Sequence, residues 1–387
     1  MRKRFVFSST LLAGLVLSGV ALACPFCQEN KGPTLVGDFK QADMVMVGKF
    51  IKARPGKAFE YESDFKVMEV LKPHAFLKGK DVITVPRYQL NPNAFLIYAD
   101  LFKGELDPYR GHELLDKGET LAYIKGAVKL ADAPPQERLK YAFNYLQSDD
   151  YEVSLDAYRE FAQADYKDYK DMAVNLPADT IADWLKSPKT APYRYGLYAS
   201  LLGHAGLKEA SKYGAMLKDM IEDPEKRKGS GIDGLLAGYA MLQPREALDY
   251  LKKNLANSKE EFLLRYACLR TARFMWEQRP DLIPEKDLVE CMVLVARLPD
   301  MSDFAIEDLR RWNRWESTPA ILDLFEKSSH DTTLIKRSIL RFALHAAAQK
   351  NEAAAKWVAA QDANWVSQVS KILERELDLK APYQRTK

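Results

Sequence analysis

The chain is poor in the residues that carry most metal and thiol chemistry. Among 387 residues there are only 5 histidines and 4 cysteines. No two histidines have the spacing of a zinc-hydrolase helix, and the glycines form neither a phosphate-binding loop nor a dinucleotide fingerprint. Ser200 and Ser211 lack the strand–turn–helix context of a hydrolase nucleophile. We therefore expect no catalytic residue, no metal and no cofactor, and a protein that is not an enzyme.

A large excess of one charge is also absent. The chain has 57 basic and 54 acidic residues, a net charge of +3. Arg2, Lys3 and Arg4 supply this surplus, so the 54 basic residues that remain equal the 54 acidic ones. Binding to nucleic acid needs a basic surface, and we therefore expect no nucleic-acid partner.

The longest uncharged apolar run lies at the N-terminus. It spans residues 5–20, follows the basic residues Arg2–Arg4 and precedes Ala21-Leu22-Ala23, a small-x-small cleavage site. This layout predicts a signal peptide over residues 1–23, with an uncleaved anchor helix as the alternative. We expect an exported protein of the periplasm, the cell envelope or the medium.

Cleavage after Ala23 leaves Cys24-Pro25-Phe26-Cys27 at the start of the mature chain. Three interpretations stay open. Residues 20–24 loosely resemble a lipobox, and a lipidated Cys24 would hold the protein at a membrane, which is the only membrane contact we expect. In an oxidising compartment Cys24 and Cys27 can form a disulfide. The pair can also serve a thiol-redox or metal site.

The other two cysteines, Cys268 and Cys291, lie in apolar segments with helical spacing. Free cysteine behaves as a small buried hydrophobic residue, and this is the favoured interpretation. A bridge between adjacent helices is the alternative, which only geometry can decide.

Residues 34–130 show the pattern of a small β domain, which we assign to residues 24–132. Apolar and charged side chains alternate with a period of two over residues 59–72, which predicts a half-buried strand. Four more strands, separated by turn-rich segments, are predicted at 43–53, 81–86, 95–101 and 119–128. Five short strands in about a hundred residues are typical of a small barrel or sandwich.

Three segments of this part resemble a known fold family: Cys24–Cys27, Ala42–Lys49 and Phe65–Lys72. Together they resemble the opening of netrin-like and tissue-inhibitor-of-metalloprotease-like OB-barrel domains. The resemblance implies an OB-type barrel. It also implies a metalloprotease inhibitor in which the amine and carbonyl of Cys24 chelate the metal of the protease. Those inhibitors begin with Cys-x-Cys, whereas this chain has Cys-x-x-Cys.

Beyond Pro134 the apolar spacing becomes helical. Apolar residues three and four positions apart line one face over 247–255 and 335–346, and prolines recur where helices are expected to begin. The rhythm predicts about ten to thirteen helices over residues 135–380, in paired units of about 40 residues. The predicted fold is α+β and multidomain, with a small N-terminal β-barrel followed by an all-α HEAT-like solenoid. A compact helical bundle is the alternative.

Four segments of the helical part carry a second resemblance: Glu137–Tyr141, Leu155–Ala162, Tyr198–Gly203 and Asp308–Trp315. They are similar to a family of uncharacterised exported bacterial proteins, whose members also begin with a signal peptide followed by Cys-Pro-Phe-Cys. The resemblance implies export and the same two-part layout, and it implies no activity.

The best candidate for a binding surface is the segment 308–315. Trp312 and Trp315 are three residues apart and are expected to share a helical face, as are Arg311 and Arg314. Asp308 is expected to reach Arg311 or Trp312 from the preceding turn. Such a set can form a platform for a carbohydrate or a peptide. The alternative, which we favour, is a joint between repeats with packed tryptophans and an Asp–Arg pair.

The sequence favours binding over catalysis, because helical-repeat solenoids expose extended surfaces and few carry chemistry of their own. We expect an exported non-enzymatic binding or scaffold protein of the cell envelope, whose partner is another protein or an envelope component. A metalloprotease inhibitor acting through Cys24 and a thiol-redox or metal-binding protein acting through Cys24 and Cys27 are the alternatives. The candidate binding residues are Asp308, Arg311, Trp312 and Trp315.

Overall fold

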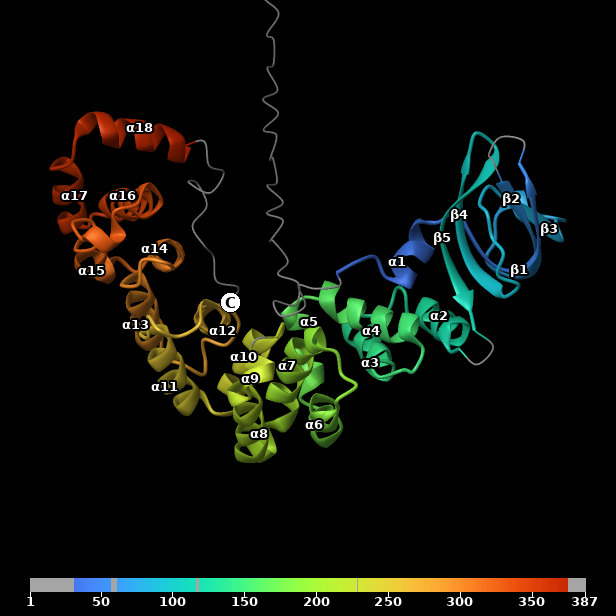
Figure 1. Cartoon of the computed structure of the whole chain (residues 1–387), viewed down its shortest axis with the longest axis horizontal. Helices are drawn as coiled ribbons and strands as arrows, with labels where there is room; N and C mark the ends of the chain where they lie inside the picture. Colours follow the sequence, from blue (N-terminus) through green and yellow to red (C-terminus); the bar gives the residue numbers. More distant parts are fainter. Residues whose placement is uncertain (1–30, 57–60, 116–117, 228, 375–387) are drawn as a thin grey trace, which may run out of the picture.

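The computed structural model describes residues 31–56, 61–115, 118–227 and 229–374. It has the predicted α+β organisation: a five-stranded antiparallel sheet is followed by a mostly helical region with 17 α-helices in these ranges. Figure 1 shows the sheet at one end of an arc of helices. Within the same ranges, no helix is both long enough and apolar enough to span a bilayer.

The sheet has the strand order β3-β2-β1-β4-β5 and is not closed. Its strands are β1 (Met44–Pro55), β2 (Tyr61–Lys72), β3 (Val82–Val85), β4 (Ala94–Phe102) and β5 (Glu105–Leu114). Four of the predicted strands are confirmed to within about two residues, the accuracy expected of such boundaries. The predicted barrel is not shown, because the edge strands β3 and β5 are not paired with each other.

The strand predicted at 119–128 is wrong, because this segment forms helix α2 (Thr120–Lys129). Its buried side chains include Tyr123, Ile124 and Ala127, which have the three-and-four spacing of a helix face. The fifth strand is β5, where no strand was predicted; it contains Pro108 and Gly111. Proline is tolerated there because β5 is an edge strand with a register shift in its pairing with β4.

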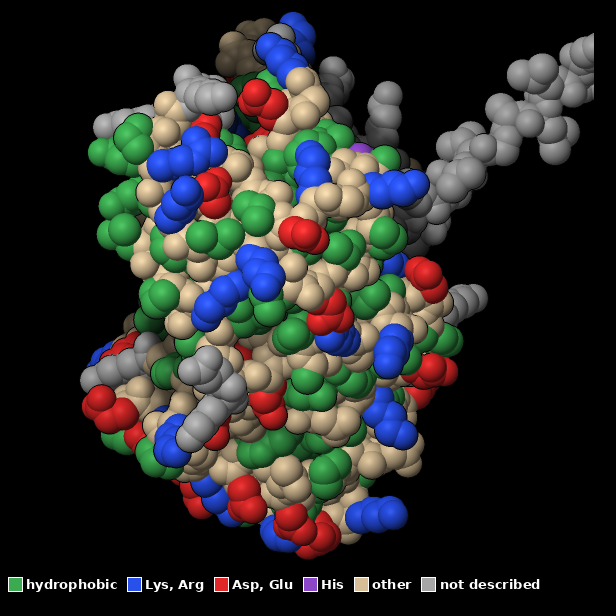
Figure 2. Space-filling model, turned by 90° about the vertical axis from the view of Figure 1, so that its right-hand side faces the viewer, with side chains coloured by type: hydrophobic (Ala, Val, Ile, Leu, Met, Phe, Trp, Pro, Cys, Tyr) green, Lys and Arg blue, Asp and Glu red, His purple; other side chains and the backbone are tan. Residues whose placement is uncertain are grey.

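The two faces of the sheet belong to different apolar cores. On one face, Val45, Val47, Leu96 and Tyr98 pack with helix α1 (Leu35–Gln41) and helix α2. On the other face, the core receives side chains from all five strands, including the edge strands β3 and β5. Sharing a core between both edges requires the sheet to curl. In Figure 2, which views this end of the molecule, basic and acidic side chains are interspersed, with hydrophobic ones scattered among them.

Beyond α3 (Pro135–Phe143) and α4 (Tyr151–Gln163), helices alternate between two layers of the arc (Figure 1). The inner layer contains α5 (Tyr166–Ala173), α7 (Tyr195–Ala205), α10 (Ile232–Leu242), α12 (Phe262–Gln278), α14 (Ser302–Arg311) and α16 (Thr333–Ala348), and α18 (Ala363–Glu374) lies across the end of the arc. The outer layer contains α6 (Ala178–Lys186), α8 (Ala210–Glu222), α11 (Pro244–Leu255), α13 (Glu285–Ala296), α15 (Thr318–Leu322) and α17 (Glu352–Ala359). The short α9 (Pro224–Arg227) follows α8. The described residues beyond Pro134 form 16 α-helices, more than the predicted ten to thirteen, and two of them, α9 and α15, have only four and five residues.

Several contacts between successive units recur at the same separation in the sequence. The pairs Arg265–Asp300 and Arg273–Asp308, which join the inner helix α12 to the next unit, are each 35 residues apart. In the outer layer, Lys252 of α11 bonds Asp287 of α13, also 35 residues away. Neighbouring units therefore lie side by side in a common register, with a spacing slightly shorter than the predicted 40 residues.

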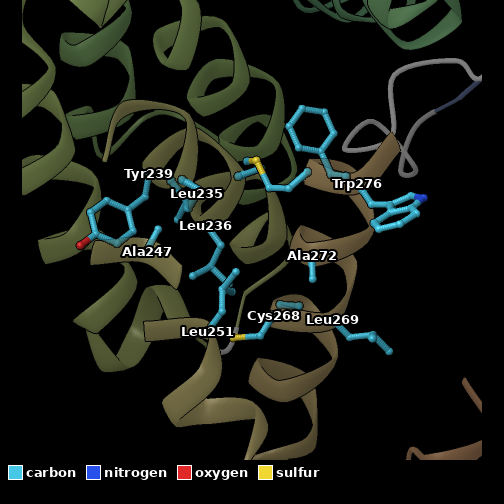
Figure 3. Packing of buried hydrophobic residues seen from close by; sticks show 14 of the residues in the cluster. Leu235, Leu236, Tyr239, Ala247, Leu251, Cys268, Leu269, Ala272 and Trp276 are labelled. Carbon is cyan, nitrogen blue, oxygen red and sulfur yellow. The ribbon is translucent and has the colours of Figure 1, made fainter. Parts of the chain in front are cut away.

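One continuous apolar core runs between the two layers, from Leu139 to Ala354. Figure 3 shows part of it, where Cys268 of α12 points toward Leu251 of α11. Cys268 and Cys291 are both buried free thiols, which confirms the favoured interpretation over a bridge. Burial raises the pKa of the Cys291 thiol to about 12. The domain boundary near Pro134 stays a prediction.

Candidate functional site

The candidate segment 308–315 is not one continuous helix. Helix α14 ends at Arg311, and Trp312 caps it. Asn313 then takes a left-handed conformation with φ of 57°, a role in which asparagine is tolerated at helix ends. Trp315 begins a separate turn, Trp315–Ser317. The prediction that Trp312 and Trp315 share a helical face is therefore wrong.

Both tryptophans are packed against aromatic neighbours. The ring of Trp312 stacks on Trp276 of α12, with centroids 4.1 Å apart and planes 9° from parallel. Trp315 makes an edge contact with Phe342 of α16, at 5.2 Å. Each tryptophan thus joins a different pair of neighbouring units, as the favoured interpretation of a joint requires.

Asp308 and the preceding Glu307 are bound by arginines from two helices, α12 and α14. Arg273 of α12 donates from Nε to Oδ2 of Asp308 at 2.6 Å. Arg311 of α14 donates from Nε to Glu307 at 3.0 Å. The Asp–Arg pair that ties neighbouring units therefore exists, but its arginine comes from the preceding unit.

These side chains border a cavity of about 510 Å³ between α12, α14 and α16. All three helices belong to the inner layer of the arc in Figure 1. The cavity brings together three of the four predicted residues, Asp308, Arg311 and Trp312, whereas Trp315 is not in its lining. The other lining residues were not predicted as site residues, and they include Arg273, Phe304, Glu307 and Arg341.

The two adjacent carboxyl groups of the cavity titrate in different ranges. Burial raises the pKa of Asp308 to about 6, although the Arg273 guanidinium opposes the shift. Burial also disfavours ionisation of Glu307, but the hydrogen bond from Arg310 and the charges of nearby arginines outweigh it. The pKa of Glu307 is therefore held below its usual value. Near neutral pH both groups are acceptors, and only Asp308 gains a proton on mild acidification.

A second buried polar cluster joins the sheet to the helices. Arg110 of β5 forms an ion pair with Asp38 of α1 and donates from Nε to His112 Nε2 at 2.6 Å. Because arginine only donates, His112 carries its proton on Nδ1, which lies 3.1 Å from Glu152 of α4. Burial, followed by the charges of Arg110 and Arg159, lowers the pKa of His112 to about 4.

Asp156 of α4 lies at the centre of this junction cluster and is almost completely buried. It accepts hydrogen bonds from the Leu35 N–H at 2.6 Å and the Tyr123 hydroxyl at 2.9 Å. Burial raises its pKa to about 7, since these two bonds and Arg110 only partly offset the lost hydration. The N-terminal helix, the sheet and α4 are thus held together by buried ionisable groups.

Neither cluster is arranged as a metal site. In the part of the chain that the structure describes, no three His, Cys, Asp or Glu side chains lie close enough together to hold a metal ion. Cys24 and Cys27 lie outside the described residues, so their interpretations stay predictions.

Comparisons with protein-family models, with curated proteins and with solved structures found no match. Both resemblances noted in the sequence therefore stay predictions, and the function has to be argued from the molecule itself.

Proposed function

We propose that this protein is an exported, non-enzymatic binding protein of the cell envelope that holds its partner on the inner side of the helical arc. In this proposal the helical region is a HEAT-like solenoid. Two observations support it: helices pack mainly on neighbours in sequence, and three contacts between units repeat at a separation of 35 residues. The curled sheet, whose two edge strands share one core, supports the proposed small barrel.

The observation that carries the binding function is an exposed aromatic strip beside the charged cavity. Phe304 lines the cavity and is 36% exposed. Its ring contacts Tyr266 at 5.7 Å, and Tyr266 in turn stacks on the exposed Phe262 at 5.9 Å. Aromatic and arginine side chains provide most of the binding energy in recognition surfaces, and here both types adjoin one cavity.

The ion pairs of the cavity favour binding over catalysis. Asp308 is paired with Arg273, and Glu307 with Arg310 and Arg311. General acid–base chemistry needs a carboxyl group available to exchange a proton with a substrate. Carboxylates that are already paired with guanidinium groups serve better as fixed acceptors for a ligand.

Site-specific photo-crosslinking in the producing cell tests the proposal. Benzoylphenylalanine is placed at Phe304 in one variant and at Arg245, an exposed residue of the outer helix α11, in the other. We expect a discrete adduct from position 304 only, and its loss when Arg311→Gln is added. Equal adducts from both positions, or none from position 304 in the exported protein, would contradict the proposal.

The alternatives that depend on Cys24 and Cys27 have their own test. Intact mass measurement with and without reductant, together with N-terminal sequencing, separates an acylated Cys24 from a disulfide and from a free amine. An acylated Cys24 eliminates both the inhibitor and the thiol hypotheses and places the binding protein at a membrane.

A further inference from the structure

We infer that the cavity between α12, α14 and α16 binds a neutral, polyhydroxylated ligand, namely a segment of a glycan. This inference rests on the proposed binding function and names the chemical class of the ligand. Three properties of the cavity carry it: its balance of charge, its combination of hydrogen-bonding groups, and its aromatic wall.

The charges that surround the cavity nearly cancel. Its lining includes the three arginines Arg273, Arg311 and Arg341, together with four acidic residues, Glu277, Asp303, Glu307 and Asp308. The buried Arg310 supplies a fourth cation, since it bonds Glu307 from behind. A site of this composition has no strong preference for an anion or a cation. A charged ligand would also have to separate a buried ion pair, which is costly.

The hydrogen-bonding groups of the cavity suit hydroxyls. Ionised carboxylates only accept hydrogen bonds, whereas guanidinium groups only donate them. Arg273 and Asp308 are joined through one Nε–Oδ2 bond, so each group retains further capacity toward the cavity. A hydroxyl donates and accepts at a single atom and can therefore bridge a carboxylate and a guanidinium without breaking their pair. A peptide carries its donor and acceptor on separate atoms and fits such close pairs less well.

The aromatic wall suits the C–H face of a sugar ring. Phe304 borders the cavity, and the aromatic strip continues from it through Tyr266 to Phe262. Such rings offer broad apolar contact while neighbouring groups take up the hydroxyls. The strip leads away from the cavity, so a linear chain of sugar rings can extend along it. The volume of about 510 Å³ lies within the usual range for small-ligand sites.

The test uses the full mature protein on an array of neutral, anionic and cationic oligosaccharides, followed by titration calorimetry with the best neutral one. We expect neutral oligosaccharides to bind, and the affinity to change less than about twofold between 0.05 and 0.5 M NaCl, because no net charge is neutralised. Phe304→Ala should weaken binding at least about tenfold, since one aromatic platform is worth more than about 1.4 kcal/mol. Arg311→Gln should weaken it severalfold, and Arg245→Gln on the outer layer should leave it unchanged.

Binding of charged oligosaccharides in preference to neutral ones, or binding that neither Phe304→Ala nor Arg311→Gln weakens, would overturn the inference. An empty array would overturn it as well. If the array is empty but position 304 crosslinks to a protein, the glycan assignment fails and the binding function stands. If both experiments fail, so do both proposals.

Discussion

Two clusters in this molecule contain buried Arg–Asp ion pairs, but they differ in how exposed the paired side chains are. In the junction cluster, the side chains of Arg110 and Asp38 are 16% and 5% exposed, and helices and strands surround them. In the cavity, the corresponding values for Arg273 and Asp308 are 26% and 8%, and Arg311 is 47% exposed. The first pair is sealed and holds two parts of the chain together. The second has donors and acceptors that face an open volume.

Residue identity alone therefore does not decide whether an ion pair is structural or available to a ligand. A sealed pair must satisfy its groups internally, because an unpaired buried charge is very costly. A pair at a cavity wall keeps part of its hydration, which a ligand can replace. Breaking each cluster separately should therefore have effects of different size.

The largest effect is expected for Arg110→Gln. This change leaves the Asp38 carboxylate buried without its cation, and the free energy of unfolding should fall by about 3–5 kcal/mol. Urea titration followed by circular dichroism measures it. Lys125→Gln is the matched control, because Lys125 and Glu69 also join α2 to the sheet but are both about 40% exposed; that variant should lose less than about 1 kcal/mol. Equal small losses in both variants would mean that water reaches Asp38.

An intermediate effect is expected for Arg273→Gln at the cavity. Asp308 loses its cation, but water in the cavity can hydrate it, so the loss should be about 1–3 kcal/mol. The pKa of Asp308 should also rise further above about 6, since the guanidinium that opposes the rise is gone. Arg311→Gln is the control, with an expected loss below about 1 kcal/mol. A loss for Arg273→Gln as large as that for Arg110→Gln would show that the two clusters are equally sealed.

The smallest change per step, at most about 1 kcal/mol per pH unit, is expected for a pair of opposite pH dependences in the junction cluster. The pKa of Asp156 is raised to about 7, so this group contributes stability that grows as the pH falls from 7 toward 4. The pKa of His112 is lowered to about 4, so its contribution is lost over nearly the same interval. In the wild type the two contributions offset each other.

Single substitutions should expose each contribution. Relative to the wild type, Asp156→Asn should lose stability on acidification from pH 7 to pH 4, by up to about 1 kcal/mol per pH unit. His112→Gln should gain by a similar amount between pH 6.5 and pH 4. Urea unfolding at a series of pH values measures both differences. Parallel profiles for the wild type and the two variants would contradict the assignment of either group.

Much of the fold was predictable because periodicity is a local property. The alternation in β2 and the helical spacing around Ala247 and Ile339 follow from which face of one element is buried. A strand was missed where pairing with a neighbouring strand decides the structure of the segment. β5 forms despite Pro108 because β4 supplies its hydrogen bonds and its other edge needs none. At Thr120–Lys129, the spacing of Tyr123, Ile124 and Ala127 was a helical signal that could have been read.

The candidate site was predictable only on one of its three walls. Asp308, Arg311 and Trp312 attract attention because they lie close together in sequence. Their contacts with Arg273 and Trp276 link residues about 35 positions apart, and no local pattern marks these pairs. Asn313 after the last helical turn was a signal for the helix end that could have separated Trp315 from the site.

The sequence by itself determined which segments are apolar on one face, and that acids and bases are equal in number beyond the first 23 residues. Only the tertiary structure decided that Asp308 meets Arg273 beside a cavity and that Asp156 is sealed beneath α1 and α2. The reason is physical. Burial, pairing and proton affinity depend on which side chains share a volume and exclude water from it, and residues far apart in the chain set that volume.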